Sequence, residues 1–403
     1  MRHEQTFGEH GRPICLSVAI AIACTLSGVA SAQSAPALTG GTGLIYVGTY
    51  PNRILVIDEA TEQVVDEIRM TLDGPPGALQ LSQDGTRFYM RDRTFEHIEV
   101  VDVATRRSID TLTLSEGTTK VRIRSFLPSP DHRYIILLTD TATKHIDRFE
   151  IAPRTLVQVD LDTHEVMREI PWPDDEERIS VNMLFSPGGD LLYLFGQEII
   201  VLSTDDFEEV ERWQLSQLDE PGLGRFDFSF RHDVNEEPGF FTGSFYVQDP
   251  VQNRRLMGIA RINLAERDID FYTLGPFERI SSFSVAPGRQ KAYGLLNQIG
   301  HYELWTFDLA GRRLEHRQVI DGRPRMALRP SSNGQILYVY RAGNTIDLYE
   351  AATQRMKIIF ITRSVCGSVW SSLKRGTSTV REAALSWRKS NQRAVQMLGG
   401  IPS

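Results

Sequence analysis

A tyrosine-bearing apolar strand recurs along this chain, and that repeat limits the possible folds more than any other feature of the sequence. The tyrosines recur every 43 to 59 residues, at Tyr46, Tyr89, Tyr134, Tyr193, Tyr246, Tyr293 and Tyr338. A second series of acidic or amide residues closes the following strand, at Asp58, Asp102, Asp160, Asp205, Asn263, Asp308 and Glu350. Periods of about 40 to 50 residues are typical of propellers with four-stranded blades. Both series predict seven blades.

Short apolar or alternating segments fill residues 44–361, and we find no clear helical periodicity there. The fold class predicted is therefore all-β, a seven-bladed β-propeller of four-stranded blades. A solenoid is the competing architecture, but radial closure leaves fewer exposed strand edges. Since the chain enters the repeat on a tyrosine strand, the innermost strand of the first blade should come from the C-terminal end. Met356–Ile361 is the expected outer strand of the last blade, and Val365–Leu373 the candidate closing strand.

The turns before the tyrosine strands are rich in Ser, Pro, Asp and Gly. They read Ser129-Pro130-Asp131, Ser186-Pro187-Gly188-Gly189, Ala286-Pro287-Gly288 and Pro330-Ser331-Ser332-Asn333-Gly334. Proline early in a turn and glycine where φ becomes positive explain this composition as hairpin chemistry.

Both ends of the chain differ from the repeat. Residues 1–32 are expected to be a signal peptide, with an apolar run over Ile14–Val29 and a small-x-small cleavage pattern at Ala30-Ser31-Ala32. The alternatives are an uncleaved membrane anchor and a lipid anchor on Cys24. Residues 33–43 form a linker. The mature protein would be periplasmic or secreted, with no membrane span after signal removal, and Cys366 would be its single cysteine, so no internal disulfide is expected.

Residues 362–403 form a basic tail, with seven Lys or Arg and one Glu. Three interpretations compete for it: an added peripheral or membrane-surface segment, a disordered tail, or the product of a shifted reading frame that replaced the native closing strand. The whole chain holds 44 basic and 52 acidic residues, a net charge of −8. Nucleic acid is not expected as a partner, because a phosphate-binding surface needs clustered Lys and Arg.

A functional site is most expected in the two longest intervals of the repeat, because insertions in propellers become loops and loops commonly hold binding and catalytic residues. In the first, over 139–159, a metal could use His145 with Asp140, Asp147 and Glu150, but their spacing matches no ligand pattern. The acidic run Pro173–Glu177 lacks the alternating carboxylates of a calcium loop. Solvated loops and turns are the simpler interpretation of both.

The second insertion, over 217–244, holds Arg231-His232-Asp233 and several phenylalanines, of which Phe226, Phe228 and Phe230 alternate as one face of a strand would. Core packing explains that alternation. The remaining histidines considered for a shared channel site are scattered over separate repeats: His97, His132, His164, His301 and His316. No nucleophile elbow or phosphate-binding loop occurs. We therefore assign no catalytic, cofactor-binding or metal residue.

The succession Arg148–Arg154, then Val159–Thr163, then the aromatic insertion at 226–246 resembles the propeller β subunit of quinohemoprotein amine dehydrogenase. The Ile-Tyr-Val and Val-Ile-Asp elements within Leu44–Asp58 resemble the wider group of YVTN-type propeller repeats. The resemblance covers roughly residues 44–353, and the order of the insertions carries most of it.

That resemblance implies a periplasmic subunit packed against a dihaem chain and a small quinone-bearing chain. Haem and tryptophylquinone would belong to those partner chains, with no cofactor in this chain and no catalysis by it alone. One alternative is a free-standing exported YVTN-type propeller that binds a ligand or surface partner. Another is a lactonase-like enzyme, because Ile45–Tyr50 resembles the opening strand of that family, although no matching acid, base and histidine set follows.

Overall fold

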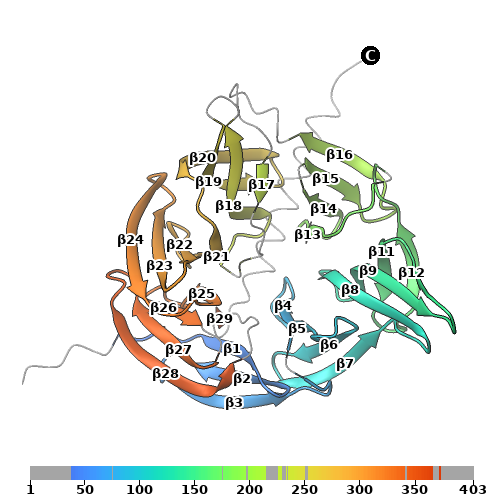
Figure 1. The fold of residues 1–403 in the computed structure, drawn as a ribbon, viewed down its shortest axis with the longest axis horizontal. Coiled ribbons are helices and arrows are strands. Elements are labelled where there is room, and N and C mark those ends of the chain that lie inside the picture. Colours follow the sequence, from blue (N-terminus) through green and yellow to red (C-terminus); the bar gives the residue numbers. More distant parts are fainter. Residues whose placement is uncertain are drawn as a thin grey trace, which may run out of the picture. The chain divides into compact units, whose positions relative to one another are not determined.

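A computed structural model describes residues 38–74, 76–174, 176–196, 198–214, 226–228, 233, 235–249, 253–340, 343–365 and 372–373. Over these residues the regular secondary structure is entirely β-strand, arranged as seven blades around a common centre, of which the last and the first are joined in one eight-stranded sheet (Figure 1). The prediction of an all-β, seven-bladed propeller is confirmed. None of the described segments forms a helix that is long and apolar enough to cross a membrane.

The blades are numbered here in chain order. Blade 1 contains β1 (Leu44–Thr49), β2 (Arg53–Asp58) and β3 (Gln63–Arg69), with β29 (Ser372–Leu373). Blade 2 contains β4 (Ala78–Leu81), β5 (Arg87–Arg91), β6 (His97–Asp102) and β7 (Arg107–Thr113). Blade 3 contains β8 (Thr119–Pro128), β9 (Tyr134–Lys144), β10 (Phe149–Ile151), β11 (Thr155–Asp160) and β12 (Val166–Ile170).

The other four blades each contain four consecutive antiparallel strands. Blade 4 contains β13 (Asn182–Phe185), β14 (Leu191–Phe195), β15 (Glu198–Ser203) and β16 (Glu209–Gln214). Blade 5 contains β17 (Phe226–Phe228), β18 (Phe240–Asp249), β19 (Arg254–Asn263) and β20 (Asp268–Pro276). Blade 6 contains β21 (Ile280–Val285), β22 (Lys291–Asn297), β23 (His301–Asp308) and β24 (Arg313–Asp321). Blade 7 contains β25 (Ala327–Pro330), β26 (Ile336–Tyr340), β27 (Gly343–Glu350) and β28 (Met356–Val365).

Every tyrosine of the sequence series lies in the second strand from the centre of its blade. Apart from Tyr246, these side chains pack in the apolar clusters between blades, and some of them also form hydrogen bonds across a seam. The hydroxyl of Tyr89 lies 2.9 Å from Nδ1 of His132 in blade 3, and that of Tyr193 donates to the carbonyl of Leu264 in blade 5 at 3.3 Å. Burial raises the pKa of Tyr293 to about 12, as expected for a phenol withdrawn from water. The tyrosine repeat is therefore a packing repeat.

The apolar cores of the propeller lie between blades. Seven buried clusters are present, and each combines residues from two neighbouring blades. Blades 7 and 1, for example, share a cluster that includes Ile45, Ile57, Tyr338 and Ile346. A blade thus stabilises itself mainly by burying both faces against its neighbours.

The turn after the third strand has the same geometry in all seven blades. Its last residue has a positive φ, between 52° and 62°, although none of the seven is glycine: Glu62, Arg106, His164, Phe207, Arg267, Arg312 and Gln354. Side-chain oxygens at the strand end cap these turns, as where Asp160 accepts the amide of Thr163. In blade 4 the prediction of Asp205 as the strand-closing residue was wrong, because β15 ends at Ser203, whose Oγ accepts the amide of Asp205.

Each of these seven side chains contacts the preceding blade. The pairs are Glu62 with Lys357, Arg106 with Asp66 (2.6 Å), His164 with Asp110 (2.9 Å), Phe207 with Arg168 (5.4 Å, ring centroid to guanidinium), Arg267 with Glu211 (2.9 Å), Arg312 with Asp270 (2.7 Å) and Gln354 with Thr306 (2.8 Å). The positive φ turns each side chain across the seam, so one backbone conformation repeated seven times links every blade to the one before it.

The turns before the tyrosine strands confirm the predicted hairpin chemistry, with one correction. Gly85, Gly189 and Gly334 have positive φ, as expected for glycine in such turns. In the Ala286-Pro287-Gly288 turn, however, the residue with positive φ is Arg289 and not Gly288. The reason is the position in the turn, since the amide of Arg289 closes it by donating to the carbonyl of Ala286 at 2.8 Å.

The ring closes at the seam between blades 7 and 1. Ser372 and Leu373 pair with Ile45 and Leu44 on the side of β1 opposite to β2, so blade 1 receives its innermost strand from the C-terminal end. The expected outer strand Met356–Ile361 is present as β28 and continues to Val365, which pairs with Thr49. The signal peptide at 1–32, Cys366 and the tail beyond 373 lie outside the described residues.

Candidate functional site

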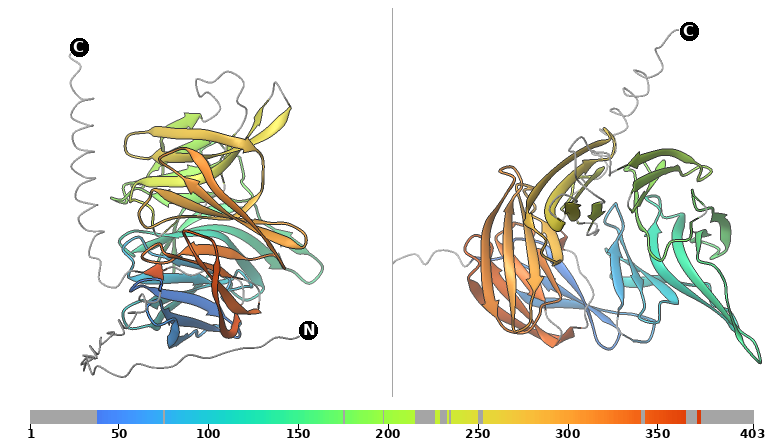
Figure 2. Two further views of the ribbon diagram at one scale, coloured as in Figure 1. Left: turned by 90° about the vertical axis from the view of Figure 1, so that its left-hand side faces the viewer. Right: turned by 45° about the horizontal axis from the view of Figure 1, so that its top comes forward.

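The first insertion forms an arm on blade 3, defined here as residues 119–123 of β8, 139–144 of β9 and 149–151 of β10. β8 pairs along one edge of β9, while β10 and β11 share the other edge. Figure 2 shows this teal hairpin extending past the rest of its blade. The arm thus carries residues 140–151 away from the packed part of the blade on antiparallel strands.

The polar residues considered for a metal on this arm are engaged in separate ion pairs. Asp140 binds Arg154, with Oδ1 2.7 Å from Nε, and His145 Nε2 lies 2.9 Å from Oε2 of Glu150. Asp147 pairs with its neighbour Arg148. In the described part of the chain, no group of three or more His, Cys, Asp or Glu side chains is placed to hold a metal ion. The structure therefore does not bring these four candidates together.

The acidic run Pro173–Glu177 is likewise occupied by arginines. Asp174 binds Arg178 at 2.6 Å, and Glu177 accepts from Arg154 at 2.7 Å. The hydrogen bond from Arg178 lowers the pKa of Asp174 despite the opposing effect of partial burial. Asp175 lies outside the described residues. The first pair lies within the loop, and the second connects the loop to Arg154, which precedes β11 and also binds Asp140 of β9.

Of Arg231-His232-Asp233, only Asp233 belongs to the described residues. Its carboxylate is buried and accepts hydrogen bonds from Ser284 Oγ at 2.5 Å and from the amide of Val285 at 3.0 Å. Asp233 thus links blade 5 to the innermost strand of blade 6. Phe226 and Phe228 lie in β17 as predicted for one strand, and Phe230 is outside the described residues.

The structure does not gather the scattered histidines at one site: His97 lies in blade 2, His132 and His164 in blade 3, and His301 and His316 in blade 6. His97 contacts Asp92 at 3.1 Å, and His301 lies 3.8 Å from Glu303. His132 is held between the hydroxyl of Tyr89 and the carboxylate of Asp84, at 2.9 and 3.0 Å.

The Tyr89–His132–Asp84 chain has the connectivity of a proton relay. Tyr89 is fully buried, however, so its oxygen cannot reach a substrate. Although partial burial acts against it, hydrogen bonds from His132 and Ser82 lower the pKa of Asp84. The chain stabilises the seam between blades 2 and 3.

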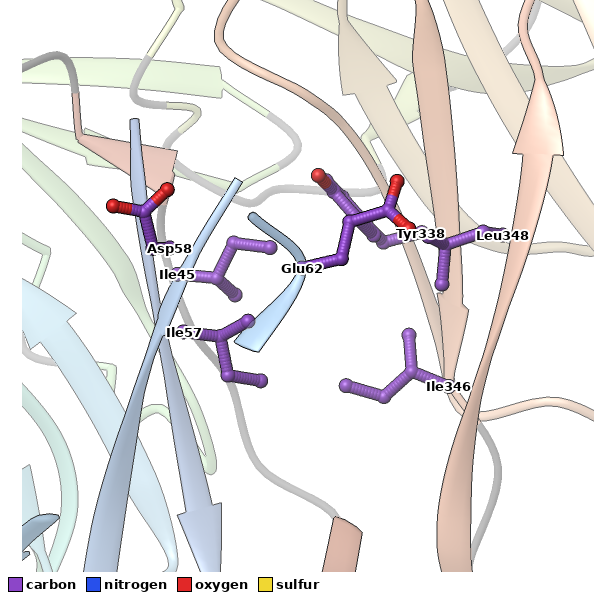
Figure 3. A pocket seen from close by; sticks show the side chains of 7 residues that line it. All are labelled: Ile45, Ile57, Asp58, Glu62, Tyr338, Ile346 and Leu348. Carbon is purple, nitrogen blue, oxygen red and sulfur yellow. The ribbon is translucent and has the colours of Figure 1, made fainter. Parts of the chain in front are cut away.

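A small cavity of about 10 Å³, partly open to solvent, lies between blades 7 and 1 (Figure 3). Its lining is mainly aliphatic and consists of Ile45, Ile57, Asp58, Glu62, Tyr338, Ile346 and Leu348. The carboxylates serve the fold: Asp58 accepts the amide of Ala60 at 2.8 Å, and Glu62 pairs with Lys357. We therefore interpret this cavity as a packing gap between two blades and not as an active site.

The exposed apolar residues of the arm are the functional candidates that the sequence analysis missed. Phe149 and Ile151 are each 69% exposed, and Ile146 at the turn between β9 and β10 is fully exposed. The available signal was the Phe-Glu-Ile alternation inside an otherwise polar insertion, which predicts a two-faced strand but not the absence of a covering neighbour. An apolar cluster that the blade leaves uncovered is typical of an interaction surface.

No protein-family model and no curated protein matches this chain. Among solved structures it is similar to apo AztD from Citrobacter koseri, at 12% identity and a TM-score of 0.51, covering 84% of this chain and 100% of that one. It also aligns with dihydro-heme d1 dehydrogenase NirN in complex with DHE, at 13% identity and a TM-score of 0.48, covering 86% and 76%. Kuenenia stuttgartiensis hydrazine synthase gives 12% identity, a TM-score of 0.46 and coverage of 77% and 90%. At 12% identity, the likeness to apo AztD is one of fold alone.

Proposed function

We propose that this chain is a non-catalytic propeller subunit of a periplasmic dehydrogenase complex, similar in role to the β subunit of quinohemoprotein amine dehydrogenase. In this proposal the haem and the tryptophylquinone belong to partner chains, and the propeller supplies a rigid docking platform. The predicted signal peptide at 1–32 supports the periplasmic location. The order of insertions along the sequence supports the family.

One observation carries the proposal: the segment 148–154, one of the elements in which the resemblance was found, includes the exposed strand β10. Phe149 and Ile151 are solvent-exposed on that strand and are absent from the buried clusters of blade 3. Side chains that contribute so little to the blade can still bury substantial apolar area against another protein. A partner interface therefore accounts for these residues better than folding does.

Co-purification tests the proposal. Native protein isolated at low salt should elute from a sizing column together with a chain that absorbs in the haem Soret band. Elution as a monomer without a haem-bearing companion would refute the subunit role and leave the free-standing propeller as the alternative.

Substitutions on the arm locate the contact. Phe149→Ser with Ile151→Ser should reduce the co-eluting haem by at least about tenfold, because two apolar anchors are lost. The matched control is Val166→Ser with Met167→Ser, a pair of comparably exposed apolar residues on β12 of the same blade. Equal losses in both double variants would place the contact outside the arm.

A further inference from the structure

The outer edge of β10 has main-chain groups directed away from its own sheet. Among the strands that the structure describes, β10 pairs only with β9, in the register Phe149 with Lys144, Glu150 with Thr143 and Ile151 with Ala142. The flanking bonds run from His145 N to Arg148 O at 2.8 Å and from Ala152 N to Thr141 O at 3.0 Å. Bonding alternates along an antiparallel strand. The amides and carbonyls of Phe149 and Ile151 therefore point away from β9.

The same two residues place their side chains on one face of the arm, together with basic neighbours. Directly opposed residues share a face, so Phe149 lies beside Lys144, and Ile151 beside Ala142. One strand further in, Lys120 opposes Ala142 and Arg122 opposes Asp140, which puts both cations on that face.

The arm is basic on an acidic protein. Residues 119–124 and 140–154 hold six Lys or Arg and three Asp or Glu, whereas the whole chain has a net charge of −8. Several of these charges are neutralised locally, as where Lys120 pairs with Glu96. Lys144 and Arg122 are exposed and have no ion pair within the described ranges, so their charge is available to a partner.

We propose that β10 accepts an extended segment of another protein as an additional antiparallel strand, and that this segment carries apolar and acidic residues on the face that it shares with Phe149 and Ile151. The inference rests on the proposed function and specifies how the partner is held. The outward main-chain groups of Phe149 and Ile151 would supply the hydrogen bonds of strand addition. Their side chains would pack with the apolar residues, while Lys144 and Arg122 would attract the carboxylates.

A second copy of this chain fits the edge less well. Two β10 strands that join through the outward groups of Phe149 and Ile151 place Glu150 directly opposite its own copy. Like charges in that position destabilise a strand pair. An anionic membrane is also a poor occupant, because Asp147 and Glu150 lie among the apolar residues of the tip.

The probe is a fluorescein-labelled, acetylated nine-residue peptide with valine and aspartate in turn at every second position and threonine between them, titrated with the full chain and followed by fluorescence anisotropy. We expect saturable binding that weakens as salt increases, and no binding of the analogue that has lysine in place of aspartate. Two further peptides have N-methylated backbone amides, one at the odd-numbered residues and the other at the even-numbered residues. Because amides point alternately to the two edges of a strand, only one of these peptides loses the amides that would bond to β10. That peptide alone should fail to bind, a result that side-chain contact by itself would not produce.

Two substitutions at one position separate backbone from side-chain recognition. Ile151→Pro removes an outward amide without breaking the pairing to β9 and should weaken binding at least tenfold more than Ile151→Ala. Lys144→Glu with Arg122→Glu should weaken the acidic peptide about tenfold. The circular dichroism spectrum and the midpoint of thermal unfolding verify that each variant is folded.

Several outcomes would overturn the inference: no binding of the acidic peptide, equal loss with both N-methylated peptides, or equal affinity of Ile151→Pro and Ile151→Ala. Dimerisation that Ile151→Pro abolishes would assign the edge to a second copy. Binding to phosphatidylglycerol vesicles without peptide binding would assign it to lipid. The proposed function has a separate test: it fails if native protein has no haem-bearing companion. If Ile151→Pro leaves that companion bound, the proposed function survives while strand addition at β10 does not explain the contact.

Discussion

At the seam between blades 7 and 1, Glu59 is fully buried and its carboxylate accepts hydrogen bonds from the amides of Gly43 and Ser332, both at 3.1 Å. On the arm of blade 3, by contrast, Phe149 and Ile151 leave most of their side chains in water. The seam joins parts of the chain that are far apart in sequence, and its polar groups have partners within the chain. The arm is local in sequence, and its apolar side chains are uncovered. This difference separates residues that serve folding from residues available for recognition.

Removing the Glu59 carboxylate is the strongest way to break the seam. Glu59→Ala leaves the buried amide of Ser332 without its acceptor and the amide of Gly43 with the Ser332 hydroxyl alone, and it should lower the free energy of unfolding by about 3 kcal/mol. Glu59→Gln keeps one side-chain oxygen and should cost about half as much. Urea unfolding followed by tryptophan fluorescence measures both. Wild-type stability of Glu59→Ala would show that the seam does not depend on this carboxylate.

Acid should weaken another seam, the one between blades 2 and 3. Since the folded-state pKa of Asp84 is lowered, its carboxylate contributes stability above the ordinary aspartate pKa, and that contribution is lost as the pH falls through and below that range. We expect Asp84→Asn to cost about 1 kcal/mol at pH 7, because solvent screens a carboxylate that is over a third exposed. The cost should be smaller at pH 2, where the carboxylate has lost part of that contribution. Urea midpoints compared at the two pH values test this, and a cost that is equal at both would contradict it.

The arm should be almost neutral for folding. Phe149→Ser with Ile151→Ser is expected to change the free energy of unfolding by less than about 0.5 kcal/mol, as for exposed positions elsewhere. A loss above about 1.5 kcal/mol would mean that the arm packs on its own protein, and the contrast with the seam would then fail. Thermal unfolding beside the Glu59 variants gives the direct comparison.

The blade count could be predicted because tyrosine strands and closing acidic residues recur with the period of one blade. Asp205 was misplaced by two residues because Ser203 performs the same capping, and a serine in a polar turn gives no distinctive signal. The contacts across the seams were not predictable either. His164 with Asp110 and Arg106 with Asp66 join residues 54 and 40 positions apart, and only the stacking of neighbouring blades brings them together.

The arm illustrates the same limit for the candidate site. The sequence marks residues 139–159 as an insertion and shows the Phe149-Glu150-Ile151 alternation, but it does not reveal whether another strand covers that face. That depends on β11 pairing with β9 over Tyr134–Thr139 and leaving β10 at the edge.

By itself, the sequence determined the strand period, the number of blades and the entry of the chain on a tyrosine strand, because these follow from local alternation and turn chemistry. The tertiary structure decided which polar groups meet across seams, how β29 completes blade 1, and which apolar residues stay in water. The physical reason is that burial and pairing are properties of surfaces in contact, and those surfaces come from different blades.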